Sequence, residues 1–324
     1  MSERIVVVGG SGFIGTRFVS RLIAAGHDVT IADKIPSAAH PALSLACDVR
    51  DPAALARAVH GASVVFNLAA EHRDDVHPRS LYDDVNVQGA RNLCAAIDAA
   101  GITRLVFTSS VAVYGFAETE RVEDSPLAPF NDYGRTKLEA ERVYDDWFGR
   151  GGGRALTIVR PTVVFGEGNR GNVYNLVRQL ASGLFVMVGS GTNRKSMAYV
   201  ENVAACLEWT LSHRAGRRLY NYADGPDFDM NALVAVVRES LGRSAKVPVR
   251  LPYAVGYGLG RVADAVAAVT GRRLPFSAVR VKKFCSNTRI AARRVLDDGF
   301  RPPEQLETAL RRWIRAEFGA SIRG

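Results

Sequence analysis

The tyrosine and lysine of Tyr133-Gly134-Arg135-Thr136-Lys137 have the spacing that places two side chains on one face of a helix. An ammonium beside a phenol favours the phenolate, so Lys137 could make Tyr133 an acid or a base near neutral pH. The pair alone is weak evidence, because a tyrosine and a lysine four residues apart also occur on solvated helix faces. A second feature, the stretch Gly9-Gly10-Ser11-Gly12-Phe13-Ile14-Gly15, gives the pair its significance.

Three glycines, Gly9, Gly12 and Gly15, lie between a β-branched run and a helical pattern. A chain that turns so tightly can bring its backbone close to a pyrophosphate at the N-terminus of the helix. Asp33 ends the next apolar run, roughly 20 residues downstream, where a carboxylate accepts the adenosine ribose hydroxyls and repels a 2′-phosphate. These residues favour NAD over NADP, although the charge of Lys34 acts against that preference.

The elements that must position these residues alternate along the first half of the chain. β-branched runs predict strands at 5–8, 28–32, 63–68, 104–108 and 155–159, and helical patterns predict helices at 13–25, 52–58, 87–100 and 133–148. Such alternation is typical of an α/β fold, a doubly wound parallel sheet with helices on both faces.

After Arg160-Pro161 this alternation loosens into loops and two helical patterns, at 172–182 and 200–212. We therefore expect an NAD-binding domain at 1–165 and a smaller substrate-binding lobe at 166–324, which ends in a basic tail. A helix and a strand near 200–222 are expected to return to the first domain.

The composition of the 324-residue chain, 47% hydrophobic and 23% charged, is that of a soluble globular protein. The four cysteines lack CxxC pairing and histidine partners at ligand spacing, which predicts reduced thiols, no metal site and a cytoplasmic location. The N-terminus lacks the features of a signal peptide. The longest apolar stretch, 251–271, contains Arg261 and Asp264 and falls short of the ~18 uncharged residues of a spanning helix.

The net charge of +9 is concentrated in the tail, where thirteen Arg and Lys face five Asp and Glu from residue 271 onward. Such a tail suits a diphosphate, an anionic membrane surface or nucleic acid. Nucleic acid is disfavoured as a partner, because no base-stacking aromatic series accompanies the charges. The apolar run 251–271 either rests peripherally on the inner face of the cytoplasmic membrane or packs as a helix on the lobe.

Several blocks of the first half resemble the extended short-chain dehydrogenase/reductase family. Besides the glycine loop and the Tyr133/Lys137 pair they are Asp48-Val49, Asn67-Leu68-Ala69-Ala70, Val85-Asn86-Val87-Gln88-Gly89 and Thr108-Ser109-Ser110-Val111-Ala112-Val113-Tyr114-Gly115. The resemblance implies a Rossmann fold, a homodimer formed through 87–100 and 133–148, and NAD as cofactor. The implied NAD contacts are Gly9, Gly12, Phe13, Ile14, Gly15, Asp33, Lys34, Asp48, Val49, Leu68, Ala69, Ala70, Tyr133, Lys137 and Pro161.

The same resemblance implies a catalytic role for three side chains. Tyr133 is the acid or base, Lys137 lowers its pKa and holds the nicotinamide ribose, and Ser110 hydrogen-bonds the reacting oxygen. Sugar-nucleotide 4,6-dehydratases carry an Asp-Glu pair just after the serine or threonine, whereas this chain has Val111 and Ala112, so dehydration is disfavoured. The first half does not separate a 4-epimerase from a reductase.

Longer blocks resemble a narrower group, bacterial enzymes of O-antigen and lipopolysaccharide synthesis that interconvert N-acetylglucosamine and N-acetylgalactosamine on undecaprenyl diphosphate. The blocks begin at Ala69, Arg160, Gly168, Lys195 and Val279. This resemblance implies an NAD-dependent 4-epimerase, which acts by hydride transfer at C4 through a 4-keto intermediate. The substrate contacts that we expect are Glu71, His72, Ser110, Asn172, Lys195, Arg280 and Lys282.

The stretch Ser277-Ala278-Val279-Arg280-Val281-Lys282-Lys283 bears on the carrier of the sugar. Relatives that act on nucleotide sugars typically have an Arg-x-Gly-Asp-like segment here, whose carboxylate holds the ribose; this chain has the cations without the carboxylate. A lipid diphosphate is therefore favoured, with a UDP-sugar 4-epimerase and an NAD(P)H-dependent 4-keto-sugar reductase as alternatives. A non-catalytic NAD-sensing or scaffold protein is disfavoured by the intact Ser110, Tyr133 and Lys137. Two alternatives to a substrate contact also stay open. Lys195 could be an ordinary surface lysine, and Glu71 could lie in an ordinary solvated loop.

Overall fold

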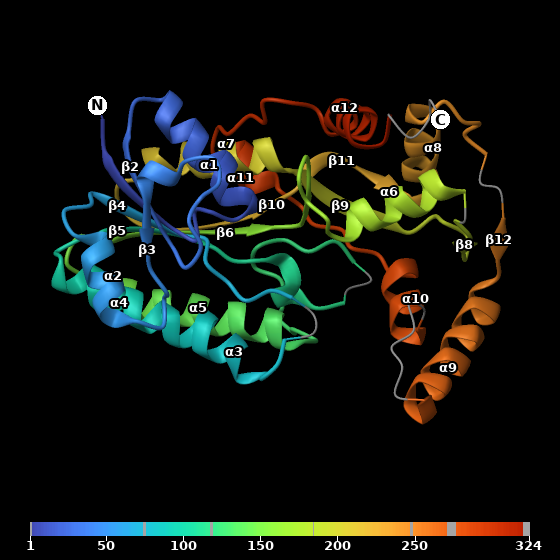
Figure 1. The fold of residues 1–324 in the computed structure, drawn as a ribbon, viewed down its shortest axis with the longest axis horizontal. Helices are drawn as coiled ribbons and strands as arrows, with labels where there is room; N and C mark the ends of the chain where they lie inside the picture. Colours follow the sequence, from blue (N-terminus) through green and yellow to red (C-terminus); the bar gives the residue numbers. More distant parts are fainter. Residues whose placement is uncertain are drawn as a thin grey trace.

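The centre of the molecule is a parallel sheet with the strand order β10-β6-β5-β4-β1-β2-β3 (Figure 1). The computed structural model describes residues 2–73, 76–116, 119–183, 185–246, 249–270 and 277–319, without the side chain of residue 269. The strands are β1 (Arg4–Val8), β2 (Asp28–Asp33), β3 (Ser44–Ala46), β4 (Val64–Asn67), β5 (Arg104–Thr108), β6 (Ala155–Pro161) and β10 (Gly216–Tyr222).

The order of the strands creates a crevice beside β1. The chain runs outward from β1 through β2 and β3, then crosses to β4 on the other side and continues through β5 and β6. Loops that leave the carboxyl ends of β1 and β4 therefore diverge to opposite faces, and ligands of open α/β sheets bind at such a reversal. The predicted doubly wound α/β fold is confirmed.

Helices cover both faces of this sheet (Figure 1). One face carries α1 (Phe13–Ala24), α7 (Val200–Trp209) and α11 (Arg293–Asp297), and the other carries α2 (Pro52–Val59), α4 (Gly89–Ala99) and α5 (Asp132–Gly149). Buried strand residues such as Val6 and Val7 point alternately to the two layers, which is why the central strands are apolar without interruption.

The second lobe is built on a three-stranded sheet of β7 (Val163–Phe165), β9 (Arg194–Tyr199) and β11 (Asp224–Asp229). Its core packs around the buried Trp313 of α12 (Leu306–Phe318), with α6 (Asn172–Ser182) and α8 (Met230–Ser240). The short strands β8 (Met187–Val188) and β12 (Arg250–Leu251) pair beside it, and α9 (Tyr253–Thr270) and α10 (Ala278–Cys285) project from this end (Figure 1). Short 3-10 helices are η1 (Pro41–Leu43), η3 (Val111–Tyr114) and η4 (Thr210–Ser212).

Two differences from the expected elements have physical causes. The helix expected to begin at 87 is preceded by α3 (Ser80–Tyr82) and the π-helical turn η2 (Asp83–Gln88), whose wider winding breaks the 3.6-residue period. Strand β3 was not among the five predicted strands, because it is short and exposed. Strand β10 lies in the segment 200–222, where a returning helix and strand were expected. Strand β10 pairs with β6, and α7 packs on α1. The domain boundary at residue 165 stays a prediction.

Candidate active site

The glycine loop closes the carboxyl end of β1 against the end of β4. Gly9 has a φ of +78°, and a Cβ there would lie 2.5 Å from the backbone nitrogen of Ala69. At Gly15, a Cβ would lie 2.7 Å from the backbone of Gly10. Only glycine therefore lets the loop turn, approach Leu68-Ala69 and begin α1 at once. The result is a backbone cradle at a helix N-terminus, the form that binds a pyrophosphate.

The side chains around this cradle fit NAD. One carboxylate oxygen of Asp33 accepts a hydrogen bond from the Ser11 backbone N–H at 3.1 Å, which fixes the acid at the end of β2. The Ser11 hydroxyl is buried and has no hydrogen-bond partner within the protein. A polar group of a bound cofactor would supply that partner. Lys34 is exposed, and Asp48 forms an ion pair with Arg50 at 2.6 Å that holds the Asp48 pKa below its usual range.

Ser110 and Tyr133 meet at the carboxyl end of β5. Ser110 caps η3, where its Oγ accepts a hydrogen bond from the Ala112 N–H at 3.2 Å. The first turn of α5 can come this close because residue 134 is glycine: a Cβ there would lie 2.5 Å from the Ala112 carbonyl oxygen. Burial raises the pKa of the Tyr133 phenol, and the Ser110 side chain acts against that rise.

Lys137 lies on the same helix, one turn after Tyr133, and its side chain is almost entirely buried. Its Nζ donates to the Thr108 carbonyl oxygen at 2.7 Å and lies 4.6 Å from the centre of the Phe107 ring. Burial lowers the Lys137 pKa to about 7, and the negative charge of Glu141 acts in the opposite direction. In the protein alone the ammonium is directed at the Thr108 carbonyl, and the expected lowering of the Tyr133 pKa by Lys137 stays a prediction.

Beneath Ser110 and Lys137 is a buried polar network that sequence reasoning missed. Both carboxylate oxygens of Glu141 accept hydrogen bonds from Arg160, at 2.8 and 2.5 Å, and Oε1 also accepts one from the Ser109 hydroxyl at 2.5 Å. Arg160 Nη1 donates to the Tyr114 hydroxyl at 2.7 Å. The network ties β6 and α5 to both ends of the segment that carries Ser110. The available signal was the position of Glu141, four residues after Lys137 on one helix face.

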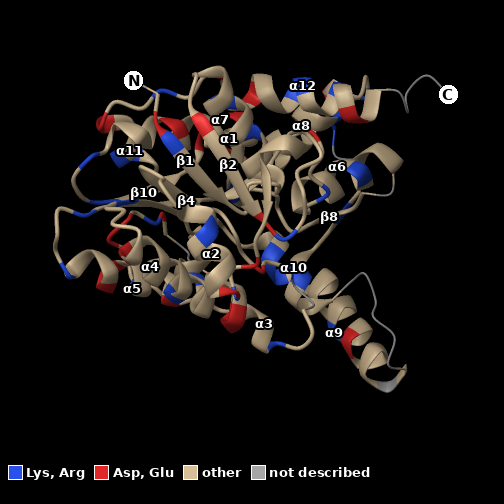
Figure 2. Cartoon of the chain, turned by 60° about the vertical axis from the view of Figure 1, so that its left-hand side comes forward, with Lys and Arg blue, Asp and Glu red and all other residues tan. Residues whose placement is uncertain are grey.

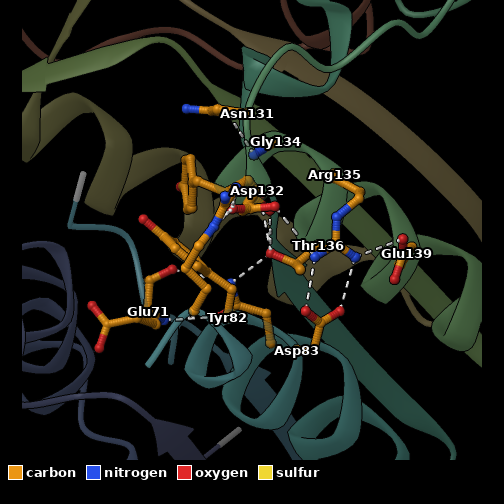
Figure 3. A network of polar contacts seen from close by, with 12 residues as sticks. Glu71, Tyr82, Asp83, Asn131, Asp132, Gly134, Arg135, Thr136 and Glu139 are labelled. Atoms are coloured by element: carbon orange, nitrogen blue, oxygen red, sulfur yellow. Dashed lines mark hydrogen bonds and ion pairs between the residues drawn. The ribbon is translucent and has the colours of Figure 1, made fainter. Parts of the chain in front are cut away.

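Figure 3 shows a second network, which joins the end of β4 to α5. Glu71 N–H donates to Asn86 Oδ1 at 2.8 Å, and Asn86 Nδ2 donates to the Glu71 carbonyl at 3.0 Å and to Thr136 Oγ1 at 2.9 Å. On the neighbouring turn, Arg135 makes two hydrogen bonds of 2.8 Å to Asp83. The segment after Ala70 is therefore held against the helix that carries Tyr133 and Lys137.

Glu71 and His72, two of the expected substrate contacts in the first domain, differ in exposure. Glu71 is buried and forms an ion pair with Arg73 at 2.9 Å, which holds the Glu71 pKa below its usual range, whereas His72 is exposed. Part of this block, residues 74 and 75, lies outside the described residues.

In the lobe, the Lys195 ammonium contacts backbone carbonyls, and its expected contact with a diphosphate stays a prediction. Its Nζ donates to the carbonyl oxygens of Lys283 and Ser286 at the end of α10, and burial lowers its pKa to about 8. A cavity of about 440 Å³ opens nearby, and Lys282 lines it together with Tyr253 and Asn193. Arg280 and Asn172 are exposed, on α10 and at the start of α6.

The structure thus brings the expected NAD residues and catalytic residues together along the carboxyl ends of β1, β2, β4, β5 and β6. It places Lys282 at a cavity of the lobe and the Lys195 ammonium against carbonyl oxygens at the end of α10. Among the described residues, no cluster of His, Cys, Asp and Glu could hold a metal ion.

Fold and site together are those of a Rossmann-type oxidoreductase or isomerase. The sequence profile of the NAD dependent epimerase/dehydratase family matches residues 5–223, and the chain belongs to this family. NAD is the cofactor of the family, in agreement with the cradle and Asp33.

The chain is also similar to individual known proteins. The chain is 47% identical over 321 residues to the N-acetyl-alpha-D-glucosaminyl-diphospho-ditrans,octacis-undecaprenol 4-epimerase of Escherichia coli O157:H7, covering 98% of this chain and 96% of the relative. It is 28% identical over 247 residues to the UDP-glucose 4-epimerase of Vibrio cholerae, covering 72% and 74%. The solved structure of MoeE5 in complex with UDP-glucose and NAD superimposes with a TM-score of 0.76 at 25% identity, covering 99% and 100%.

Proposed function

We propose that the protein is an NAD-dependent 4-epimerase that interconverts N-acetylglucosamine and N-acetylgalactosamine on undecaprenyl diphosphate. The observation that carries this proposal is the end-to-end similarity to the Escherichia coli enzyme, which includes the lobe as well as the NAD-binding half. Ser110 and Tyr133 at the end of β5, with Lys137 one turn on, supply the acid/base chemistry that epimerisation needs.

The chemistry assigned to the residues follows from their positions. Bound NAD supplies the acceptor and donor of the C4 hydride. Tyr133 takes the O4 proton as the alcohol is oxidised and returns it when the 4-keto sugar is reduced on its other face. Ser110 hydrogen-bonds O4 and the phenol, which keeps the proton path short. The Lys137 ammonium favours the phenolate once this ammonium turns from the Thr108 carbonyl to the nicotinamide ribose and the Tyr133 phenol.

Elimination of water is not supported by the residues next to Ser110. Val111 and Ala112 occupy the first turn of η3, and neither side chain can move a proton. A UDP-sugar 4-epimerase is the second candidate, because the Vibrio cholerae relative has that activity in its name and the fold is shared. The missing ribose carboxylate between Ser277 and Lys283 favours the lipid carrier.

Peripheral contact with an anionic membrane is part of the proposal. Val255, Leu259, Val262 and Val266 follow a 4-3-4 spacing along α9 and are 48%, 52%, 62% and 45% exposed, so they form an apolar stripe. Gly256 and Gly260 face the body, where a Cβ would lie 2.5 Å from a Val188 side-chain atom and 2.6 Å from the Ala278 backbone nitrogen. The helix thus turns its apolar side outward.

The charge distribution supports a bilayer as the occupant of this stripe. Figure 2 shows α9 nearly free of charged residues next to α10, which carries Arg280, Lys282 and Lys283. An apolar stripe flanked by cations suits the boundary between acyl chains and anionic headgroups. No helix in the described part of the chain is both long and apolar enough to cross a membrane.

We also propose a homodimer formed through α4 and α5, which lie side by side on one face of the sheet (Figure 1). The support is the family resemblance of the first half of the chain.

The proposed activity is tested with purified protein and N-acetylglucosaminyl diphosphoundecaprenol, without added reductant. Acid release and chromatography of the sugar should show N-acetylgalactosamine approaching a constant ratio. A product that forms only in proportion to added NADH would instead identify a reductase.

A further inference from the structure

Two exposed phenylalanines lie beside the catalytic residues and have no role in the site described so far. The rings of Phe116 and Phe130 stack with centroids 4.4 Å apart, yet the residues are 41% and 45% exposed. Phe116 follows the segment that carries Ser110, and Phe130 directly precedes Asn131, the cap of α5. An exposed aromatic pair at such a place is a candidate ligand surface.

The backbone holds this pair in place. Ala128 N–H donates to the Val113 carbonyl at 3.0 Å, which joins the two chain segments. Between them Gly115 has a φ of +68°, and a Cβ there would lie 2.0 Å from the Ala128 carbonyl oxygen. Residue 115 must therefore be glycine, and the close approach of the segments fixes Phe116 next to Phe130.

Two lysines from the other lobe complete the patch. The Lys283 ammonium lies 4.9 Å from the centre of the Phe130 ring, and the Lys282 ammonium lies 5.8 Å from that of Phe116. Within the described residues, neither ammonium forms an ion pair with a carboxylate. The aromatic faces attract these cations but leave their charge uncompensated, so an anion can still bind to them.

The cavity of the lobe begins at the same place. Lys282 lines the cavity of about 440 Å³ whose other polar residues include Ser190, Asn193 and Asn287. Lys282 therefore stands between a polar cavity and an apolar aromatic pair. A ligand that reaches both must carry negative charge next to an apolar group.

We propose that Phe116, Phe130, Lys282 and Lys283 bind the carrier of the sugar, with the ammoniums on the diphosphate and the rings against the first units of a polyprenyl chain. In a prenyl diphosphate the anion and the apolar chain are joined directly, as the lysines and rings are here. This inference rests on the proposed function and extends it, because it makes Phe116 and Phe130 determinants of carrier specificity.

Equilibrium binding tests the inference without any need for turnover. The protein with NAD bound is titrated with farnesyl diphosphate and with methyl diphosphate by calorimetry. Farnesyl diphosphate should bind at least about tenfold more tightly, because its chain covers two aromatic faces. F116A/F130A should lose most of that preference, whereas K282Q/K283Q should weaken both ligands by about tenfold or more.

Matched controls separate these effects from general damage. Leu296→Ala removes an apolar side chain of similar exposure on α11, and Lys246→Gln removes an exposed lysine that does not line the cavity; neither should change the binding of either ligand. Phe130→Ala alone is the second variant if the double variant does not fold. Equal binding of the two ligands by the unaltered protein, or an undiminished farnesyl preference in the phenylalanine variants, would overturn the inference.

Failure of the inference and failure of the proposed function give different results. If the unaltered protein converts the lipid-linked sugar but F116A/F130A leaves KM for it unchanged, the function stands and the carrier site is wrong. If the protein binds farnesyl diphosphate through the phenylalanines but converts only UDP-N-acetylglucosamine, the assigned epimerase substrate is wrong.

Discussion

The Lys137 ammonium lies 2.7 Å from the Thr108 carbonyl oxygen, so in the protein alone it serves the end of β5 and not the Tyr133 phenol. Its pKa is lowered to about 7 by burial. Since an unfolded lysine has a pKa near ~10.4, the unfolded chain binds more protons than the folded protein between these two values. Stability should therefore rise with pH across that interval.

Lys137→Met tests this charge directly. The variant should be more stable than the unaltered protein below pH 7, where the buried ammonium destabilises the fold most, and the difference should shrink as the pH rises to about 10. Urea unfolding at pH 6, 8 and 10 measures it. A difference that does not depend on pH would contradict this account, because it would show that the Lys137 amine has the same pKa in the folded and the unfolded chain.

Tyr133→Phe should lower kcat by about 10²- to 10⁴-fold, because the proton of O4 loses its acceptor. NAD binding should change little, since the glycine cradle and Asp33 are untouched. Turnover of the lipid-linked sugar and calorimetric titration with NAD give the two readouts. Retained turnover would remove Tyr133 from the catalytic role.

Glu141→Gln should destabilise the fold by about 3–5 kcal/mol, because it leaves the Arg160 guanidinium buried without its counter-charge. The side chains of Arg160 and Glu141 are only 3% and 4% exposed. Asp145→Asn on the same helix is the matched control: its ion pair with Arg217 is about one-third exposed and should contribute less than about 1 kcal/mol. Equal effects in urea unfolding would argue against a special role of the buried pair.

Asp33→Ser should narrow the discrimination between NAD and NADP, because it removes the carboxylate that repels a 2′-phosphate. The hydroxyl can still accept the hydrogen bond from the Ser11 N–H, so the loop should keep its shape. The ratio of the two dissociation constants is the measurement. An unchanged ratio would mean that the selectivity comes from elsewhere in the cradle.

L259Q/V262Q should weaken binding to vesicles that contain phosphatidylglycerol by about tenfold, because two apolar side chains of the α9 stripe can no longer enter the bilayer. Ile23→Gln, which changes an apolar side chain of α1 that is 39% exposed, is the control and should have no effect. Vesicle co-sedimentation measures both. If all three proteins sediment alike, α9 is not the membrane contact.

The parts of the site that the sequence predicted are those with local signals. Short stretches of sequence are enough to recognise the glycine loop, Asp33 and the Tyr133/Lys137 spacing. The alternation of strands and helices then places these residues at one edge of the sheet. The direction of the Lys137 ammonium was not predictable, because it depends on the Thr108 carbonyl, twenty-nine residues away in sequence. The same holds for Lys195, which closes the end of α10 through contacts to residues 283 and 286.

The hydrogen-bond networks that support the site are even harder to predict from sequence patterns. Arg160 is joined to Glu141 and Tyr114 across three elements, and no periodicity relates these positions. Phe116 and Phe130 look like ordinary loop residues until the turn at Gly115 brings them together. Packing between distant segments creates such features, so only the folded structure reveals them.

The central claim is tested most directly by a paired assay, in which the purified protein receives N-acetylglucosamine either as the undecaprenyl diphosphate or as the UDP conjugate. The sugar is then released with acid and identified. The account predicts N-acetylgalactosamine from the lipid-linked substrate and little or none from the UDP sugar. Conversion of the UDP sugar alone would contradict it and would place the protein among the nucleotide-sugar epimerases.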